Sequence, residues 1–113
     1  MPADPRLTSE VLVGALRRRV NDSGGFATVL AKGDAISGVI LVQALEKGAY
    51  QGLFERISNH EGGGALMRCG PSPEDGPEAL DQYLARRRRS DPDLWVIELD
   101  IPDAERFAAE TIC

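Results

Sequence analysis

Cysteine, histidine and long apolar runs are all scarce in this sequence, and their scarcity excludes several classes of protein. The two cysteines, Cys69 and Cys113, lie far apart and outside any Cys-x-x-Cys pair or Cys/His cluster, so neither a zinc site nor a redox motif is indicated. No apolar stretch approaches the ~20 residues that a membrane-spanning helix needs. Because residues 1–6 contain no apolar segment, we expect no secretory signal, which together with the few cysteines favours a reducing cytoplasm.

The residues that are present have the composition of one folded domain. The 113 residues are 42% hydrophobic and 27% charged, and the formal net charge is −5. This length corresponds to a single domain spanning residues 1–113, and a chain of this size buries a core without metal or disulfide. Because no cluster of metal-ligating residues is visible either, we expect no cofactor and no metal ion.

Hydrophobic periodicity predicts a helix, four strands, a helix, a strand and a helix, in that order. The helices are expected at 8–20, at 77–89 and from 102 onward, and the strands at 26–32, 39–45, 50–57, 65–69 and 94–99. Because the links between the first four strands are too short for crossover helices, we expect about five strands arranged as an antiparallel meander. Neighbouring strands flanked by helices place the domain in the α+β class.

Alternation along the predicted strands indicates which side chains share a face of the sheet. In the third strand, Tyr50 and Phe54 are expected on one face and Leu53 on the other. In the last strand, alternation places Trp95 with the apolar residues of the core side.

Several stretches of the sequence together resemble one known family. They are Arg6-Leu7-Thr8, Val13 to Arg18, Gly24 to Ala27, Lys32-Gly33-Asp34, Gly38, Tyr83 to Arg86 and, as the most specific segment, Ser90 to Glu98. The family is the small bacterial one catalogued as domain of unknown function 1491, and the resemblance covers nearly the whole chain. It implies a short single-domain bacterial protein, and it implies no activity, because none is assigned to the family.

Residues that could support acyl-transfer or nucleotide chemistry are better explained structurally. The only histidine, His60, stands beside three glycines with no Gly-x-Ser-x-Gly segment in the chain, so we interpret it as an exposed loop residue. Cys69 in a predicted strand is typical of a small core residue. The pair Gly24-Gly25 follows a helix and precedes a strand, the reverse of a phosphate-binding loop. We therefore lean towards a protein that is not an enzyme, with no catalytic residue assigned.

The segment Asp91-Pro92-Asp93 is predicted to be a structural hinge between the second helix and the last strand. Carboxylates at such a junction usually accept hydrogen bonds from the nearby backbone. Together with Asp100 and Glu98, the two aspartates could instead hold Mg²⁺, which we consider the less favoured alternative. We interpret Asp91, Pro92, Asp93 and Trp95 as a structural motif.

Two runs of arginine, at 17–19 and 86–89, lie in the last turns of two predicted helices, where the helix dipole favours cations. No acidic residue stands four positions before any of them, whereas residues 91–113 hold seven acids and one base. The counter-charge must therefore come from the tertiary structure, a partner subunit or a ligand. Helical phase directs Arg87 towards the apolar side and an acid of the final segment, and it leaves Arg86 and Arg89 outward.

The unbalanced arginines carry the functional hypothesis. We expect a small cytoplasmic binding or assembly module that contacts an acidic protein surface or another copy of itself, with Arg17, Arg18, Arg86 and Arg89 as the contact residues. The alternative is an RNA-binding accessory protein, which the net charge of −5 and the presence of only six aromatic residues disfavour. No membrane partner is expected.

Overall fold

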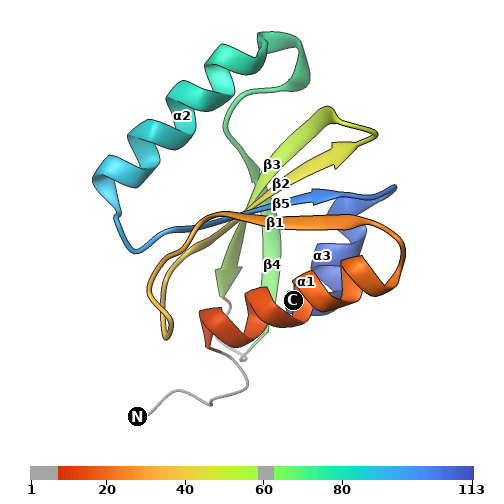
Figure 1. Cartoon of the computed structure of the whole chain (residues 1–113). Helices are drawn as coiled ribbons and strands as arrows, with labels where there is room; N and C mark the ends of the chain where they lie inside the picture. The colour runs from red at the N-terminus through yellow and green to blue at the C-terminus, as the bar shows by residue number, and fades with distance from the viewer. Residues whose placement is uncertain (1–7, 59–62) are drawn as a thin grey trace.

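The computed structural model describes residues 8–58 and 63–113, which form a five-stranded sheet with helices on both faces (Figure 1). The elements are α1 (Ser9–Asp22), β1 (Phe26–Ala31), β2 (Ile40–Glu46), β3 (Ala49–Ser58), β4 (Gly64–Cys69), the 3₁₀ turn η2 (Pro73–Asp75), α2 (Pro77–Ser90), β5 (Trp95–Asp100) and α3 (Ala104–Ile112). This order of helices and strands agrees with the one predicted from hydrophobic periodicity. No helix in the described ranges is long and apolar enough to cross a membrane.

The sheet is mixed, so the prediction of a purely antiparallel meander is wrong. The strand order is β1-β5-β2-β3-β4, with β5 inserted between β1 and β2. β5 pairs antiparallel with β1 and parallel with β2. The segment containing α2 carries the chain back across the sheet, which is how a parallel neighbour is reached. Four of the six residues of β5 are buried and the other two are partly buried, as expected of a central strand.

Helix α1 is capped by Thr8, whose side chain accepts a hydrogen bond from the Val11 N–H. Its buried residues Leu12, Leu16 and Val20 recur at helical spacing and face the sheet. Helices α1 and α3 lie on the same face of the sheet, whereas α2 lies on the other (Figure 1). The two helix layers therefore bury two separate apolar clusters.

The strand β3 shows one local departure from simple alternation. Phe54 packs in the apolar cluster on the α1/α3 face, whereas Tyr50 packs with Leu53 on the α2 face. The prediction that Tyr50 and Phe54 share a face is therefore wrong. The register of the β2–β3 pair shifts between Ala44, which is opposite Gly52, and Leu45, which is opposite Tyr50. The extra residue in β3 interrupts the alternation and places the Tyr50 side chain on the opposite face.

Candidate functional site

The arginine run 86–89 occupies the C-terminal half of α2, and one of its members is engaged within the fold. Arg87 Nη2 lies 2.8 Å from Glu55 Oε1 and its Nη1 lies 2.8 Å from the Tyr83 hydroxyl. Although burial acts in the opposite direction, the hydrogen bonds to Glu55 and Tyr83 raise the pKa of Arg87 above its ordinary value. Arg87 lies towards the sheet as predicted, but its acid is on β3 and not in the final segment.

The other three arginines of α2 project into solvent. Arg86 is stacked over the Tyr83 ring, with its guanidinium carbon 5.7 Å from the ring centroid. Neither Arg86, Arg88 nor Arg89 forms a hydrogen bond or ion pair with another residue of the described part of the chain. Three adjacent guanidinium groups are therefore available to a partner.

Shallow hollows lie on two sides of this half of α2. One, of about 430 Å³, is lined by Gly70, Pro71, Ala79, Gln82, Tyr83 and Arg86. The other, of about 380 Å³, is lined by Ala85, Arg88, Arg89 and Pro92. Among the described residues, no acid lines either hollow, and each hollow combines arginine with proline and alanine surface. This end of α2 thus suits an anionic group attached to an apolar body.

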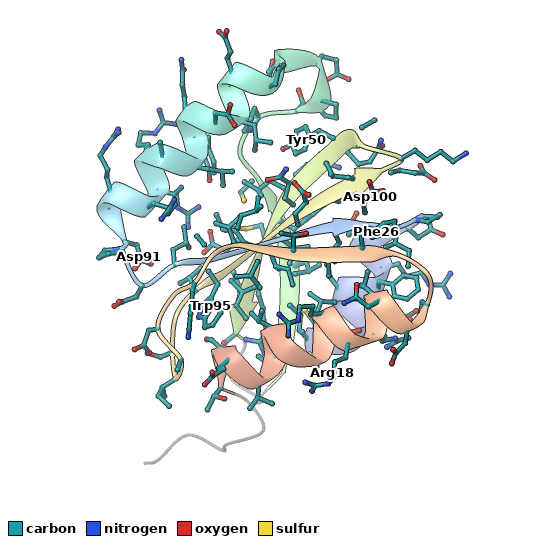
Figure 2. All side chains as sticks on the ribbon, viewed as in Figure 1. Arg18, Phe26, Tyr50, Asp91, Trp95 and Asp100 are labelled. Atoms are coloured by element: carbon teal, nitrogen blue, oxygen red, sulfur yellow. The ribbon has the colours of Figure 1, made fainter. Side chains whose placement is uncertain are left out.

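The arginines of α1 form a separate group. Arg19 bonds to Glu110 of α3 at 3.1 Å and lies over the Phe107 ring, so it joins the two helices. Arg17 and Arg18 are exposed and have no hydrogen bond or ion pair to residues within 8–58 or 63–113. Because α1 and α2 lie on opposite faces of the sheet, the two arginine groups do not form one surface (Figure 2).

The segment Asp91 to Trp95 connects α2 to β5 and docks on the loop between β1 and β2. Asp91 Oδ1 accepts a hydrogen bond from the Asp93 N–H at 3.1 Å. The Asp93 carbonyl accepts one from the Asp34 N–H at 2.9 Å, and the buried Trp95 donates from Nε1 to the Asp34 carbonyl at 2.7 Å. Asp91, Asp93 and Trp95, which the sequence analysis grouped as a structural motif, thus all belong to the junction between α2 and β5. Pro92 is exposed at the surface of this junction.

Two glycines make this junction possible, because a Cβ at Gly33 or at Gly38 would collide with the Asp93 carbonyl. Between them, the Asp34 carboxylate accepts hydrogen bonds from the N–H groups of Ser37 and Ile36, which lower its pKa. In the sequence, Asp34 was noted only as part of the Lys32-Gly33-Asp34 segment of the family resemblance, and no role at this junction was predicted for it. The pair Gly33-Asp34, which is typical of a turn, was the available clue.

The remaining residues considered from the sequence do not come together as a catalytic site. Cys69 is a free thiol whose pKa is raised by burial, which disfavours the thiolate form. Asp100 accepts from the backbone N–H groups of Lys47 and Gly48 in the β2–β3 turn. In the described ranges, no three acidic, histidine or cysteine side chains are grouped as they would be around a metal ion. His60 lies outside the described residues.

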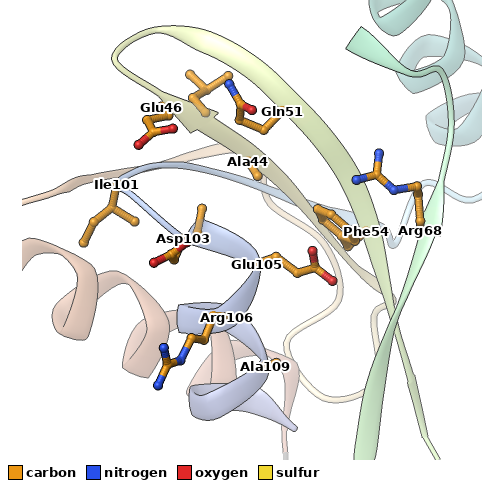
Figure 3. Close-up of a pocket in the computed structure, with 12 residues that line it drawn as sticks. Ala44, Glu46, Gln51, Phe54, Arg68, Ile101, Asp103, Glu105, Arg106 and Ala109 are labelled. Carbon is orange, nitrogen blue, oxygen red and sulfur yellow. The ribbon is translucent and has the colours of Figure 1, made fainter.

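A larger cleft, of about 450 Å³, lies between the β2–β3 hairpin and the start of α3 (Figure 3). Its floor includes Phe54, Ala44 and Ala104. Its charged lining residues are Glu46, Arg68, Asp103, Glu105 and Arg106. Sequence reasoning missed this cleft because its walls come from four separate elements, and no motif connects them.

Comparison with known proteins places this fold within a group of similar chains. The family model described as protein of unknown function (DUF1491) matches residues 7–109. A crystal structure of a DUF1491 family protein from Caulobacter crescentus is 37% identical, with a TM-score of 0.73 over 89% of this chain and 94% of that chain. A solution structure of a protein from A. tumefaciens is 31% identical, with a TM-score of 0.67 over 87% of this chain and 88% of the other. No curated protein matches the chain.

Proposed function

Because the chain belongs to the DUF1491 family, whose function is unknown, we propose a function from its own surface: a bacterial, non-enzymatic binding or assembly module that holds an acidic protein partner. The contact surface is the C-terminal half of α2, with Arg86, Arg88 and Arg89 as its cations. The observation that carries the proposal is that only one of the four arginines in this run has an acidic partner in the described residues. Arg87 is bonded to Glu55, while its three neighbours have no hydrogen bond or ion pair within the described residues and lie beside hollows that no acidic residue of those ranges lines.

Physical chemistry favours a protein partner for this surface. Guanidinium groups pair with carboxylates in a planar, bidentate geometry, and arginine is enriched at the energetic centres of protein interfaces. The hollows add apolar surface from Pro71, Ala79, Ala85 and Pro92, which an acidic peptide with small apolar side chains would cover. Free thiols and the absence of a disulfide among the described residues support a cytoplasmic location for this partnership.

A second copy of the chain is the less favoured occupant. The acids of the final segment are the ones that another copy would offer, and several are already engaged within the fold. Glu110 pairs with Arg19 and Arg106, Asp100 caps the β2–β3 turn, and Glu98 accepts from Gln43. A distinct acidic protein is therefore the better match.

RNA is the alternative partner. Arginines at a helix end bind phosphate as readily as carboxylate, and Tyr83 offers one ring beside Arg86. A single ring already covered by a guanidinium is a poor stacking platform for successive bases. The net charge of −5 opposes long-range attraction of a polyanion.

The test is site-specific photo-crosslinking in the native cell. A photoreactive residue replaces Ala85, which lines the hollow with Arg88 and Arg89, and a matched variant carries it at the exposed Glu10 on α1. We expect a protein adduct at position 85 that is lost in the triple variant Arg86→Gln/Arg88→Gln/Arg89→Gln and retained in Arg17→Gln/Arg18→Gln. An adduct that ribonuclease removes supports the RNA alternative. An adduct of twice the chain's own mass identifies a second copy, and equal labelling at both positions overturns the proposed surface.

A further inference from the structure

The strand β4 forms one edge of the sheet. Within residues 8–58 and 63–113, β4 pairs with β3 alone and stands last in the strand order. The backbone N–H and C=O groups of β4 that point away from β3 therefore have no neighbouring strand in the described part of the chain. Such a row of groups is a template to which another extended chain can bond.

The features that normally protect an edge strand from pairing are missing at β4. Its six residues pair with β3 without a register shift, whereas β1, at the other edge, has a shift that interrupts its pairing with β5. Bulges, prolines and lysines are common protective features, and β4 contains neither proline nor lysine. The one charged side chain of β4, Arg68, lies over the Phe54 ring of β3, with 5.1 Å between the guanidinium carbon and the ring centroid. It is therefore directed back over the sheet and leaves the edge open.

One face of this edge is apolar and exposed. Ala65 and Met67 of β4 are exposed on it, together with Ile57, which is opposite Ala65 on β3. These side chains lie on the α2 face with Glu55, whose carboxylate is bonded to Arg87. An added strand would cover this apolar surface with side chains of its own, as cross-strand neighbours do within a sheet.

The end of β4 leads directly to the arginine surface of α2. The strand ends at Cys69, and the next two residues, Gly70 and Pro71, line the hollow that Tyr83 and Arg86 also line. No acid of the described ranges lines that hollow. An extended segment paired with β4 thus reaches the guanidinium of Arg86 at this end of the strand.

We propose that the acidic partner binds through an extended segment that adds to β4 as an antiparallel strand. This inference rests on the proposed function, because the segment belongs to the protein that the arginines of α2 hold. Antiparallel addition places the start of the segment beside the hollow, so its acids come first and pair with Arg86. Its following apolar residues lie against Ala65 and Met67. A second copy fits less well, because its own β4 would bring Gly64 and Ala65, and no acid, to the hollow.

The experiment measures NMR titration and amide hydrogen exchange of the full chain with a synthetic acetylated peptide amide, Asp-Asp-Val-Thr-Val-Thr-Val. With this peptide at about ten times its Kd, the β4 amides that are not bonded to β3 should exchange about tenfold more slowly, and those of β1 should not change. A matched peptide that begins Asn-Asn should bind about tenfold more weakly, because it lacks the charge-assisted hydrogen bond to Arg86. Binding without protection of β4 overturns the added strand, and so does failure of the acidic peptide to bind.

A variant at Arg86 separates this proposal from the proposed function. Arg86→Gln should reduce the affinity for the Asp-Asp peptide to that for the Asn-Asn peptide, and Arg17→Gln, at an exposed position of α1, is the matched control that should bind unchanged. If Arg86→Gln weakens binding while β4 exchange is unaffected by the peptide, the arginine surface stands and the added strand is overturned. If β4 is protected but Arg86→Gln binds as tightly as the unmodified chain, the pairing of the acids with Arg86 is overturned.

Photo-crosslinking in the native cell extends the test to the natural partner. A photoreactive residue at Ala65 should capture the same protein as one at Ala85, whereas one at the exposed Thr28 on β1 should not. An adduct at position 85 and none at position 65 would overturn the added strand and leave the proposed function intact. An adduct at position 65 of twice the chain's own mass would identify a second copy as the occupant and overturn the acidic segment.

Discussion

The two faces of the sheet are packed very differently. On the α1/α3 face, fifteen of the described residues form one buried apolar cluster, among them Leu16, Ile97 and Ala108. On the α2 face, the corresponding cluster contains six. The α2 face also carries the exposed apolar side chains of Ile57 and Met67, which share a side of β3 and β4 with Glu55. The first face therefore supplies most of the burial that stabilises the fold, while the second retains surface for contacts with other molecules.

The largest effect that tests this comparison is the loss of a buried leucine on each face. Leu16→Ala removes a fully buried side chain from the larger cluster and should lower the free energy of unfolding by about 3–5 kcal/mol. Leu80→Ala on α2 should lower it by about 2–3 kcal/mol, because fewer neighbours surround it. Urea unfolding of the two variants measures both. Equal losses would show that the faces contribute alike.

The next effect concerns the one paired arginine of α2. Arg87→Ala removes two hydrogen bonds and leaves Glu55 half-buried without its cation, so it should lower the free energy of unfolding by about 1–3 kcal/mol. Arg86→Ala and Arg89→Ala should change it by less than about 0.5 kcal/mol, as expected at exposed sites. Thermal melts of the three variants decide the matter. Three equal melting temperatures would mean that the Glu55 contact contributes nothing to stability.

A smaller effect is expected at the junction between α2 and β5. Asp91→Ala removes the acceptor for the Asp93 N–H and should lower the free energy of unfolding by about 0.5–2 kcal/mol. Asp93→Ala is the control, since its backbone makes the contact with Asp34 and the substitution preserves that backbone. If Asp93→Ala were the more damaging of the two, a side-chain role for Asp93 would replace the hinge interpretation.

The smallest effect is a pH dependence at Asp34. Its carboxylate accepts hydrogen bonds from Ser37 and Ile36, so its pKa in the folded chain lies below the ordinary value of 3.8. A lowered folded pKa stabilises the fold above pH 3.8, and this contribution is lost as the pH falls through the folded pKa. Asp34→Asn should therefore flatten the acid limb of a stability profile measured by urea unfolding. Asp22→Asn, which removes a carboxylate from the exposed surface of α1, is the matched control variant.

Local patterns in the sequence predicted most elements of the fold. Helical spacing identified α1 from Leu12, Leu16 and Val20, and the apolar residues that fill most of 39–45 identified the strand β2. The same phase argument directed Arg87 to the sheet. These predictions succeeded because burial on one face imposes a period that is readable within a few residues of chain.

Pairing between distant segments was not readable in this way. Three features depend on which strands become neighbours: the position of β5 beside β2, the register shift that moves Tyr50, and the pairing of Glu55 with Arg87. The cleft that joins Arg68 to Asp103 has the same origin. Nothing in a local pattern specifies such neighbours, because alternation is identical in parallel and antiparallel strands.

The sequence by itself thus determined the number and order of the helices and strands and the buried face of α1, and it identified the arginines of α2 as cations without local partners. Only the tertiary structure decided which of those arginines has an acidic partner, since Glu55 precedes Arg87 by 32 residues and meets it from the strand β3. It likewise decided that the arginines of α1 and α2 lie on opposite faces. Side-chain periodicity is a local property of the chain. Charge pairing and clefts depend instead on which strands and helices become neighbours in the folded sheet.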